Sequence, residues 1–404
     1  MSFEDVQLSE QPANTRLQIL LAKTKLSISE YKDANRLIDE ITDWESVFDV
    51  ARRNFSVPLL RKHLKNLNHT DIPCDVLERI EQTANASALQ NLRMIAAQKA
   101  FQEQCLEPVK ANALFFKGVN MAAQFYPDIG LRPCRDIDVL VRTDHLRSVL
   151  KEAIKAGYTP VSPEAREIPT TSERDINAIL RLGESITLVS PERVVVDLQD
   201  DLDKHSGLFS VYDIFVNAKP FEVAGETFKT LPYAFLFNYI AHHHTRHTWS
   251  RLHWLSDLDA ICTSKKFDRN AVLDMAESLG QRGTVEASLE LHELMSTDTP
   301  WDDAKDLERG KSLLKLCILN LPGELDLEKR FRMKMIGGEF MYRWQARPDL
   351  LTKARIGWWK SVFKPTVTQY VSYPLPRSLQ WLYVIPRILD LVQRMRTRLR
   401  PSRN

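Results

Sequence analysis

The sequence contains no stretch of about 18 uncharged apolar residues, so it predicts no membrane-spanning helix. Its first residues, MSFEDVQLSEQ, are acidic and lack an apolar segment, which argues against a secretory signal there. The five cysteines include no CxxC pair and are odd in number, so the sequence gives no sign of a disulfide framework. These absences predict a reduced, cytoplasmic protein.

Net charge is also small for a chain of 404 residues. It is only +2, but eleven Lys or Arg residues and a single acid, Asp390, lie beyond position 352. This C-terminal segment therefore carries about +10, and the preceding residues sum to about −8. The basic segment is suited to meeting phosphates or anionic lipid.

The sequence does contain a long helical pattern, followed by a change of period. Residues 15–110 carry apolar side chains at three- and four-residue spacing, with prolines where helices would begin or break. A short apolar run at 114–116 and the run DIDVLV at 136–141 then predict strands separated by a helix. A helix over 143–157 and a hairpin over 184–199 follow. This order predicts an α/β domain of modest size.

The run DIDVLV places two carboxylates on one face of a strand. Side chains alternate along a strand, so Asp136 and Asp138 point opposite to Ile137 and Val139. Like charges on one face repel unless something neutralises them, and a divalent cation is a common remedy. Asp197, in the apolar run VVVDL, would add a third carboxylate if its strand were a neighbour. Mg²⁺ prefers such ligands and suits nucleotidyl transfer; the alternative is a polar face that meets water.

These residues also carry a family resemblance. KG at 117–118, Tyr126-Pro127, the stretch LRPCRDIDVLV and the later VVVDLQ resemble the DNA polymerase β-like nucleotidyltransferase superfamily. In particular, they resemble a largely uncharacterised bacterial branch with KG, Tyr-Pro, Arg-Pro and DIDLLV motifs. The resemblance covers most of residues 40–265 and is most specific at the acidic strand.

The resemblance implies an α+β fold: a small polymerase β-like α/β core with a mixed sheet, flanked by N- and C-terminal helical segments. Four regions are then expected in order, namely an N-terminal helical region, the nucleotidyltransferase core, a second helical region and a basic tail with an amphipathic helix. Their expected bounds are 1–89, 90–230, 231–345 and 346–404.

The resemblance also implies roles for individual residues. The first two aspartates would bind metal, and the third would complete the site and accept the proton of the acceptor hydroxyl. Gly118 would open a phosphate-binding helix, helped by Lys117. Val119 departs from the superfamily, which has a second Gly or Ser there, and leaves phosphate contact to backbone N–H groups.

A second block, HHHTRHTWSRLHWLSDLDAIC at 242–262, resembles a downstream helix of the same branch. We assign His243, Arg246 and His247 to nucleotide binding. The two histidines also have the spacing of zinc-binding HxxxH, but no third ligand is evident, and plain helix packing is the other alternative. Asp257 is expected to hold a basic partner on its own helix.

Two arginines, Arg132 and Arg135, precede the acidic strand. Either could bind the triphosphate or merely offset the carboxylates. We favour Arg132 for nucleotide binding, because it lies in the Arg-Pro motif and arginine suits bidentate phosphate binding.

The last predicted helix, SLQWLYVIPRILDLVQRMRTRLR, combines an apolar stripe with a cluster of arginines. Three interpretations remain open for it. The helix could dock on the protein body, lie on an anionic membrane surface, which would make the protein peripheral to the membrane, or bind RNA or another polyanion. Trp358 and Trp359 are expected to be packing or interface residues.

Together these patterns predict a Mg²⁺-dependent nucleotidyltransferase, with Mn²⁺ as the alternative ion. Its substrates would be an NTP, with ATP favoured, and an unidentified hydroxyl acceptor such as a sugar or peptide-like intermediate. The alternatives are a toxin-like nucleotidyltransferase that modifies RNA or protein, and a catalytically silent scaffold.

Overall fold

The computed structural model divides the chain into two compact units, each built from separate stretches of sequence. The described residues are 6–67, 72–170, 172–183, 185–202, 209, 211–296, 300–323, 344–345, 352, 355–357, 360 and 364–389. The first unit comprises Met1–Ile95, Phe116–Arg135 and Asn217–Leu351, and the second comprises Ala96–Phe115, Asp136–Val216 and Thr352–Asn404. The units interleave along the chain, and the four linear regions expected from the sequence stay a prediction.

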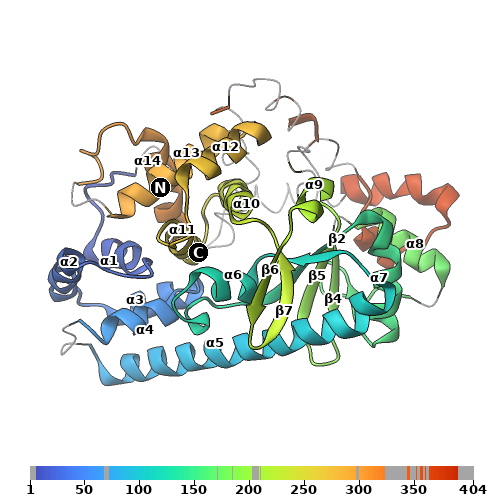
Figure 1. Cartoon of the computed structure of the whole chain (residues 1–404), viewed down its shortest axis with the longest axis horizontal. Coiled ribbons are helices and arrows are strands. Elements are labelled where there is room, and N and C mark those ends of the chain that lie inside the picture. Colours follow the sequence, from blue (N-terminus) through green and yellow to red (C-terminus); the bar gives the residue numbers. More distant parts are fainter. Residues whose placement is uncertain are drawn as a thin grey trace. The chain divides into compact units, whose positions relative to one another are not determined.

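Four short helices open the first unit (Figure 1). They are α1 Ala13–Leu21, α2 Ile28–Asp39, α3 Trp44–Arg53 and α4 Val57–Leu64. A capping box between Ser27 and Glu30 starts α2, and Pro58 lies in the first turn of α4, where its missing N–H costs no hydrogen bond. The helices enclose an apolar core around Leu17 and Trp44.

The first unit continues with a second set of helices and one hairpin. In chain order they are α6 Gly118–Phe125, the 3₁₀ turn η3 Ile129–Leu131, β6 Lys219–Val223, β7 Glu226–Thr230, α10 Tyr233–Arg246, α11 His253–Cys262, α12 Arg269–Leu279, α13 Arg282–Ser296 and α14 Glu308–Asn320. The β6–β7 hairpin was not predicted. Its turn residues Ala224 and Gly225 both have positive φ, at 52° and 80°, which is the geometry of a tight two-residue hairpin turn.

The long helix α5, Cys74–Phe101, leads from the first unit into the second. It continues as a π-helical turn, η1 Gln102–Leu106, and a 3₁₀ turn, η2 Glu107–Val109. The chain then leaves the helix through Lys110, whose left-handed φ of 49° redirects it toward the first strand.

The second unit is organised around a five-stranded mixed sheet with the order β1-β2-β5-β4-β3 (Figure 1). Its strands are β1 Ala113–Phe115, β2 Asp136–Val141, β3 Thr159–Val161, β4 Ile186–Val189 and β5 Val195–Gln199. Only β2 and β5 run parallel; the other pairs are antiparallel. The predicted α+β fold with a mixed sheet is confirmed, as are the predicted strands and the hairpin, whereas the short edge strand β3 was missed.

Helices α7 Thr143–Lys155, α8 Glu173–Leu182 and α9 Val211–Val216 complete the described body of the second unit. Gly157, with φ 87°, stands just after α7, as the sequence predicts. Along β2 and β5, Ile137, Val139, Val196 and Leu198 are all buried and point to one side of the sheet. The opposite side carries the aspartates.

The C-terminal segment of the second unit is described only in part. It contains α18 Val367–Ser372 and the 3₁₀ helix η4 Arg377–Tyr383, followed by a helical stretch that is described to residue 389. Trp358, Trp359 and the arginines beyond residue 390 lie outside the described residues. Within the described part of the chain, no helix is long and apolar enough to cross a membrane.

Candidate functional site

The first feature is a set of three aspartates on the central sheet, here called the carboxylate face: Asp136, Asp138 and Asp197. Strands β2 and β5 pair in parallel, with Asp138 directly opposite Asp197 and Asp136 opposite Val195. Because alternate residues share a face, the three carboxylates lie on the same side of the sheet. The structure thus brings the predicted aspartates together on neighbouring strands, an adjacency that the sequence alone did not reveal.

A neighbouring threonine on β4 orients one aspartate of the carboxylate face, Asp197. The hydroxyl of Thr187, opposite Asp197 on β4, donates a hydrogen bond to Asp197 Oδ1 at 2.8 Å. Asp138 is buried, and Asp136 and Asp197 are half-buried. Like charges on adjacent strands destabilise a sheet, so this arrangement favours the binding of a cation.

The donor chemistry of the carboxylate face fits Mg²⁺, because all three side chains offer only oxygen ligands. Among the described residues, no group of three His, Cys, Asp or Glu side chains is already arranged to hold a metal ion. Metal binding by the carboxylate face therefore stays a prediction. The same holds for zinc binding by His243 and His247.

The KG turn at Lys117 and Gly118 belongs to the first unit. Gly118 opens α6 with φ 55°, a left-handed conformation that side chains with a Cβ rarely adopt, which explains why glycine is needed here. Val119 is buried, so its side chain offers nothing to a ligand, in accord with its departure from the superfamily pattern. Lys117 Nζ lies 5.5 Å from the centroid of the Phe116 ring and 5.2 Å from that of Tyr239.

Basic and histidine side chains gather beside this turn; we call Lys117, His243, Arg246 and His247 the cationic cluster. The Tyr239 ring, which Lys117 approaches, lies 5.7 Å from the ring of His243, and the rings of His243 and His247 lie 4.7 Å apart. All four members are partly exposed. The structure thus brings together four of the residues that the sequence assigned to nucleotide binding.

The surroundings of His243 in the cationic cluster disfavour a proton on its ring. Burial lowers the pKa of His243 well below its ordinary value, and the positive charges of Lys117, His247, His244 and Arg246 lower it further. Burial likewise lowers the pKa of His244, whose ring stacks on Trp254 at 4.6 Å with an interplanar angle of 7°. A bound anion would offset the positive charges that surround His243.

A buried network lies behind the KG turn; we call Tyr126, Arg132 and Asp257 the Asp257 network. Arg132 Nε and Nη2 donate to the two oxygens of Asp257 at 2.7 and 2.9 Å, and the hydroxyl of Tyr126 donates to Oδ1 at 2.6 Å. Arg132 Nη1 also donates to the carbonyl of Gly118 at 3.4 Å, and Asn91 Nδ2 donates to the carbonyl of Arg132 at 2.8 Å. The Tyr-Pro, Arg-Pro and downstream Asp motifs therefore converge on the backbone of the KG turn.

The electrostatics of this network keep Arg132 charged and Tyr126 protonated. Burial alone would lower the pKa of Arg132, but the facing Asp257 carboxylate raises it well above its ordinary value. Burial raises the pKa of Tyr126, and the negative charge of Asp257 raises it further, so the phenol keeps its proton. Arg132 therefore keeps its positive charge while it donates to both oxygens of Asp257.

These contacts bear on two predicted roles. The basic side chain that donates to Asp257 is not on its own helix but is Arg132, which lies 125 residues earlier in the chain. The guanidinium of Arg132 is engaged by Asp257 and Gly118, which makes it a support for the KG turn, and phosphate binding by Arg132 stays a prediction. Arg135 lies over the ring of Phe55, at 5.2 Å from its centroid.

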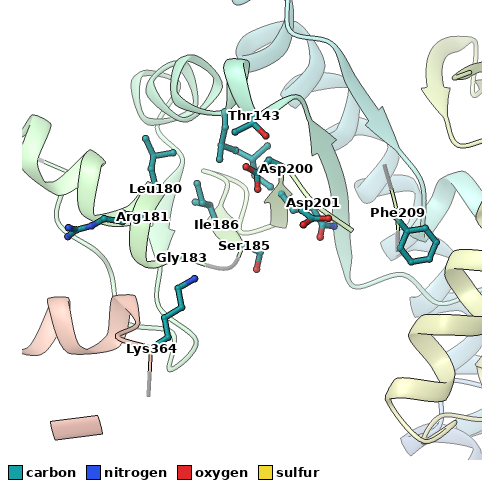
Figure 2. A pocket seen from close by; sticks show the side chains of 13 residues that line it. Thr143, Leu180, Arg181, Gly183, Ser185, Ile186, Asp200, Asp201, Phe209 and Lys364 are labelled. Carbon is teal, nitrogen blue, oxygen red and sulfur yellow. The ribbon is translucent and has the colours of Figure 1, made fainter. Parts of the chain in front are cut away.

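A cavity of about 500 Å³ lies in the second unit (Figure 2). Thr143, Arg181, Ile186 and Asp200 are among the residues that line it, and they come from α7, α8, β4 and the segment after β5. The three aspartates of the carboxylate face do not line this cavity. Its lining includes basic, acidic and apolar side chains, and this mixture does not indicate one kind of ligand.

Comparison with known proteins gives one positive finding. A family model described as an uncharacterised nucleotidyltransferase matches residues 40–296, which is more than half of the chain. The match includes the KG turn, the carboxylate face, the cationic cluster and the Asp257 network. No curated protein was found to match the chain.

Proposed function

Because the chain belongs to the uncharacterised nucleotidyltransferase family, we propose that it transfers a nucleoside monophosphate from an NTP to a hydroxyl acceptor with the help of Mg²⁺. The observation that carries this proposal is the register of β2 and β5, which sets Asp138 opposite Asp197, with Asp136 on the same face. Carboxylates on one face of neighbouring strands repel one another, and a bound divalent cation would relieve that repulsion.

In this proposal the carboxylate face would hold the metal ion. When bound, Mg²⁺ supplies positive charge that offsets the charge of the phosphates and activates an attacking oxygen. Asp136 and Asp138 are the proposed ligands. Asp197, held by the hydroxyl of Thr187, is the proposed third ligand and acceptor of the proton from the acceptor hydroxyl.

The cationic cluster is the proposed site for phosphate oxygens. Lys117 offers an ammonium group, and His243 and His247 offer ring N–H groups beside it. The backbone N–H groups at the start of α6 add further donors, and the Asp257 network supports their geometry by holding the carbonyl of Gly118. Transfer of the α-phosphoryl group to a hydroxyl would release pyrophosphate.

The finer assignments are also proposals. ATP as the nucleotide and a sugar or peptide-like intermediate as the acceptor come from resemblance to the bacterial branch. Mn²⁺ is the alternative ion, since it accepts the same oxygen ligands. No feature of the described residues favours RNA or protein as the acceptor over a small molecule.

The test is nucleotide binding measured by calorimetry with the full chain and ATP, CTP, GTP and UTP, each with and without Mg²⁺. We expect one NTP to bind only when Mg²⁺ is present. The variant Asp136→Asn/Asp138→Asn should lose this binding. The matched control is Asp144→Asn/Glu173→Gln, which removes the same charge from two exposed carboxylates of the second unit and should bind as the wild type does.

Two results would overturn the proposal. One is the absence of metal-dependent binding for all four nucleotides. The other is binding that survives Asp136→Asn/Asp138→Asn undiminished, because the metal would then be held elsewhere. Once a nucleotide has been identified, release of pyrophosphate in the presence of candidate acceptors tests the transfer step itself.

A further inference from the structure

The described C-terminal segment of the second unit is anchored on one side. Tyr370, on α18, is buried, and its hydroxyl donates to Asp175 Oδ1 of α8 at 2.6 Å. Farther along, the hydroxyl of Tyr383 donates to the carbonyl of Tyr373 at 2.6 Å, and Gln380 Nε2 donates to the carbonyl of Leu375 at 3.1 Å. Helix α18 is therefore tied to α8, and residues 373–383 are held by hydrogen bonds among themselves.

The other side of this segment exposes large apolar residues; we call Trp381, Ile385, Ile388 and Leu389 the C-terminal apolar face. Their exposed fractions are 67%, 56%, 41% and 62%. Their spacing of four, seven and eight residues places them on one side of the helical stretch that begins in η4. The segment thus has buried residues on one side and four exposed apolar residues on the other. Exposed apolar residues grouped in this way are typical of an interaction surface.

The charge of the surrounding sequence narrows the kind of partner. Arg377 and Arg387 lie within this segment, and after Asp390 the sequence contains five more arginines and no acid. Beyond position 352 the chain carries about +10, whereas the residues before it sum to about −8. A partner for this segment should therefore be negatively charged as well as apolar.

We propose that the C-terminal apolar face inserts into the surface of an anionic lipid membrane and that the neighbouring arginines bind the lipid headgroups. Tryptophan and branched aliphatic side chains next to arginines are the composition of segments that lie in a membrane interface. A nucleic acid would match the arginines but gives Ile385, Ile388 and Leu389 no role. A second copy of this chain, whose first 352 residues sum to about −8, would also offer negative charge, so the test below includes dimerisation as a separate outcome.

The test is flotation of the full chain with vesicles of phosphatidylcholine alone or of phosphatidylcholine mixed with phosphatidylglycerol. We expect binding only to the anionic vesicles, and binding should weaken as the ionic strength rises from about 0.1 M to about 1 M, where the Debye length falls from about 10 Å to about 3 Å. Trp381→Ser/Ile385→Ser should lower the affinity for anionic vesicles at least about tenfold. Unfolding in urea should remain as in the wild type, since both side chains are exposed.

A matched control separates this effect from a general loss of apolar surface. Leu89→Ser/Leu92→Ser replaces two exposed apolar residues of α5, with exposed fractions of 54% and 57%, and should leave vesicle binding unchanged. A charge variant, Arg377→Gln/Arg387→Gln, should weaken binding to anionic vesicles and reduce its dependence on salt.

Three outcomes would overturn the proposal. The first is equal binding to neutral and anionic vesicles, or none to either. The second is binding to anionic vesicles that Trp381→Ser/Ile385→Ser leaves unchanged. If the chain also binds an RNA oligonucleotide, the segment is a site for polyanions and not for a membrane surface. The third is a concentration-dependent dimer in light scattering that the same variant abolishes while vesicle binding is absent. Each outcome is independent of whether the chain binds nucleotides.

Discussion

The Asp257 network of the first unit and the carboxylate face of the second use the same functional group in opposite ways. Asp257 is completely buried, and a guanidinium and a phenol donate to its oxygens. Asp138 is almost as buried, but its direct neighbour on the next strand is another carboxylate, Asp197. A buried carboxylate that faces a cation holds a structure together. Two carboxylates that face each other repel, and a bound cation would relieve that repulsion.

The largest expected effect tests the structural half of this comparison. Asp257→Ala leaves the guanidinium of Arg132 buried without its counter-charge, so we expect unfolding in urea to show a loss of about 3–5 kcal/mol. Asp49→Ala, which removes an exposed partner of Arg52 and Arg53, is the matched control and should cost about 1 kcal/mol or less. Equal losses in the two variants would mean that the Asp257 network contributes no more than a surface ion pair.

A third buried group, His63 of the first unit, extends the comparison, because its effect on stability depends on pH. His63 is fully buried, its Nε2 lies 2.7 Å from the carbonyl of Lys23, and burial lowers its pKa to about 4. The unfolded chain, with a histidine pKa near 6.5, binds this proton more readily, so stability should fall as pH drops from about 6.5 to about 4. The contribution of His63 over this window is about 3 kcal/mol. It vanishes above pH 6.5, where both states are neutral.

The measurement is the free energy of unfolding at several pH values for the wild type and for His63→Gln. The glutamine variant keeps a side-chain donor for the carbonyl of Lys23 but does not titrate, so its stability should depend less on pH. An identical pH dependence in both proteins would assign the slope to other groups. His253, whose pKa burial also lowers to about 4, is the first of these to examine.

A smaller effect is expected at the KG turn, which the Asp257 network supports. Gly118→Ala forces a Cβ into a left-handed conformation and should cost about 1–2 kcal/mol. Gly280→Ala is the matched control, because Gly280 also has a positive φ, of 70°, but ends α12. Both variants should lose similar stability, and only Gly118→Ala should weaken NTP binding. Equal binding in the two variants would remove the KG turn from the nucleotide site.

Local patterns predicted much of this molecule. Alternation in DIDVLV fixed which side of β2 carries Asp136 and Asp138, and the glycine after α7 marked the end of that helix. The sequence did not reveal that β5 would lie beside β2, because strand order depends on long-range packing. The pairing of Arg132 with Asp257 was missed for the same reason: no periodicity connects residues 125 positions apart. The edge strand β3, of only three residues, leaves too short a pattern to be recognised.

The smallest effect on stability is expected for Asp138→Asn, and it tests whether Asp138 and Asp257 have different roles. Asp138→Asn removes one of two facing charges, so without Mg²⁺ we expect it to cost less stability than the same change at Asp257. Asp257→Asn, the same chemical change at a site that faces a cation, should destabilise the protein. Addition of Mg²⁺ and the nucleotide identified by calorimetry should then raise the free energy of unfolding of the wild type but not of Asp138→Asn. A ligand stabilises a folded protein only if the folded protein binds it. If Asp138→Asn instead unfolds as readily as Asp257→Asn, both carboxylates are structural, and the metal site must be sought elsewhere in the chain.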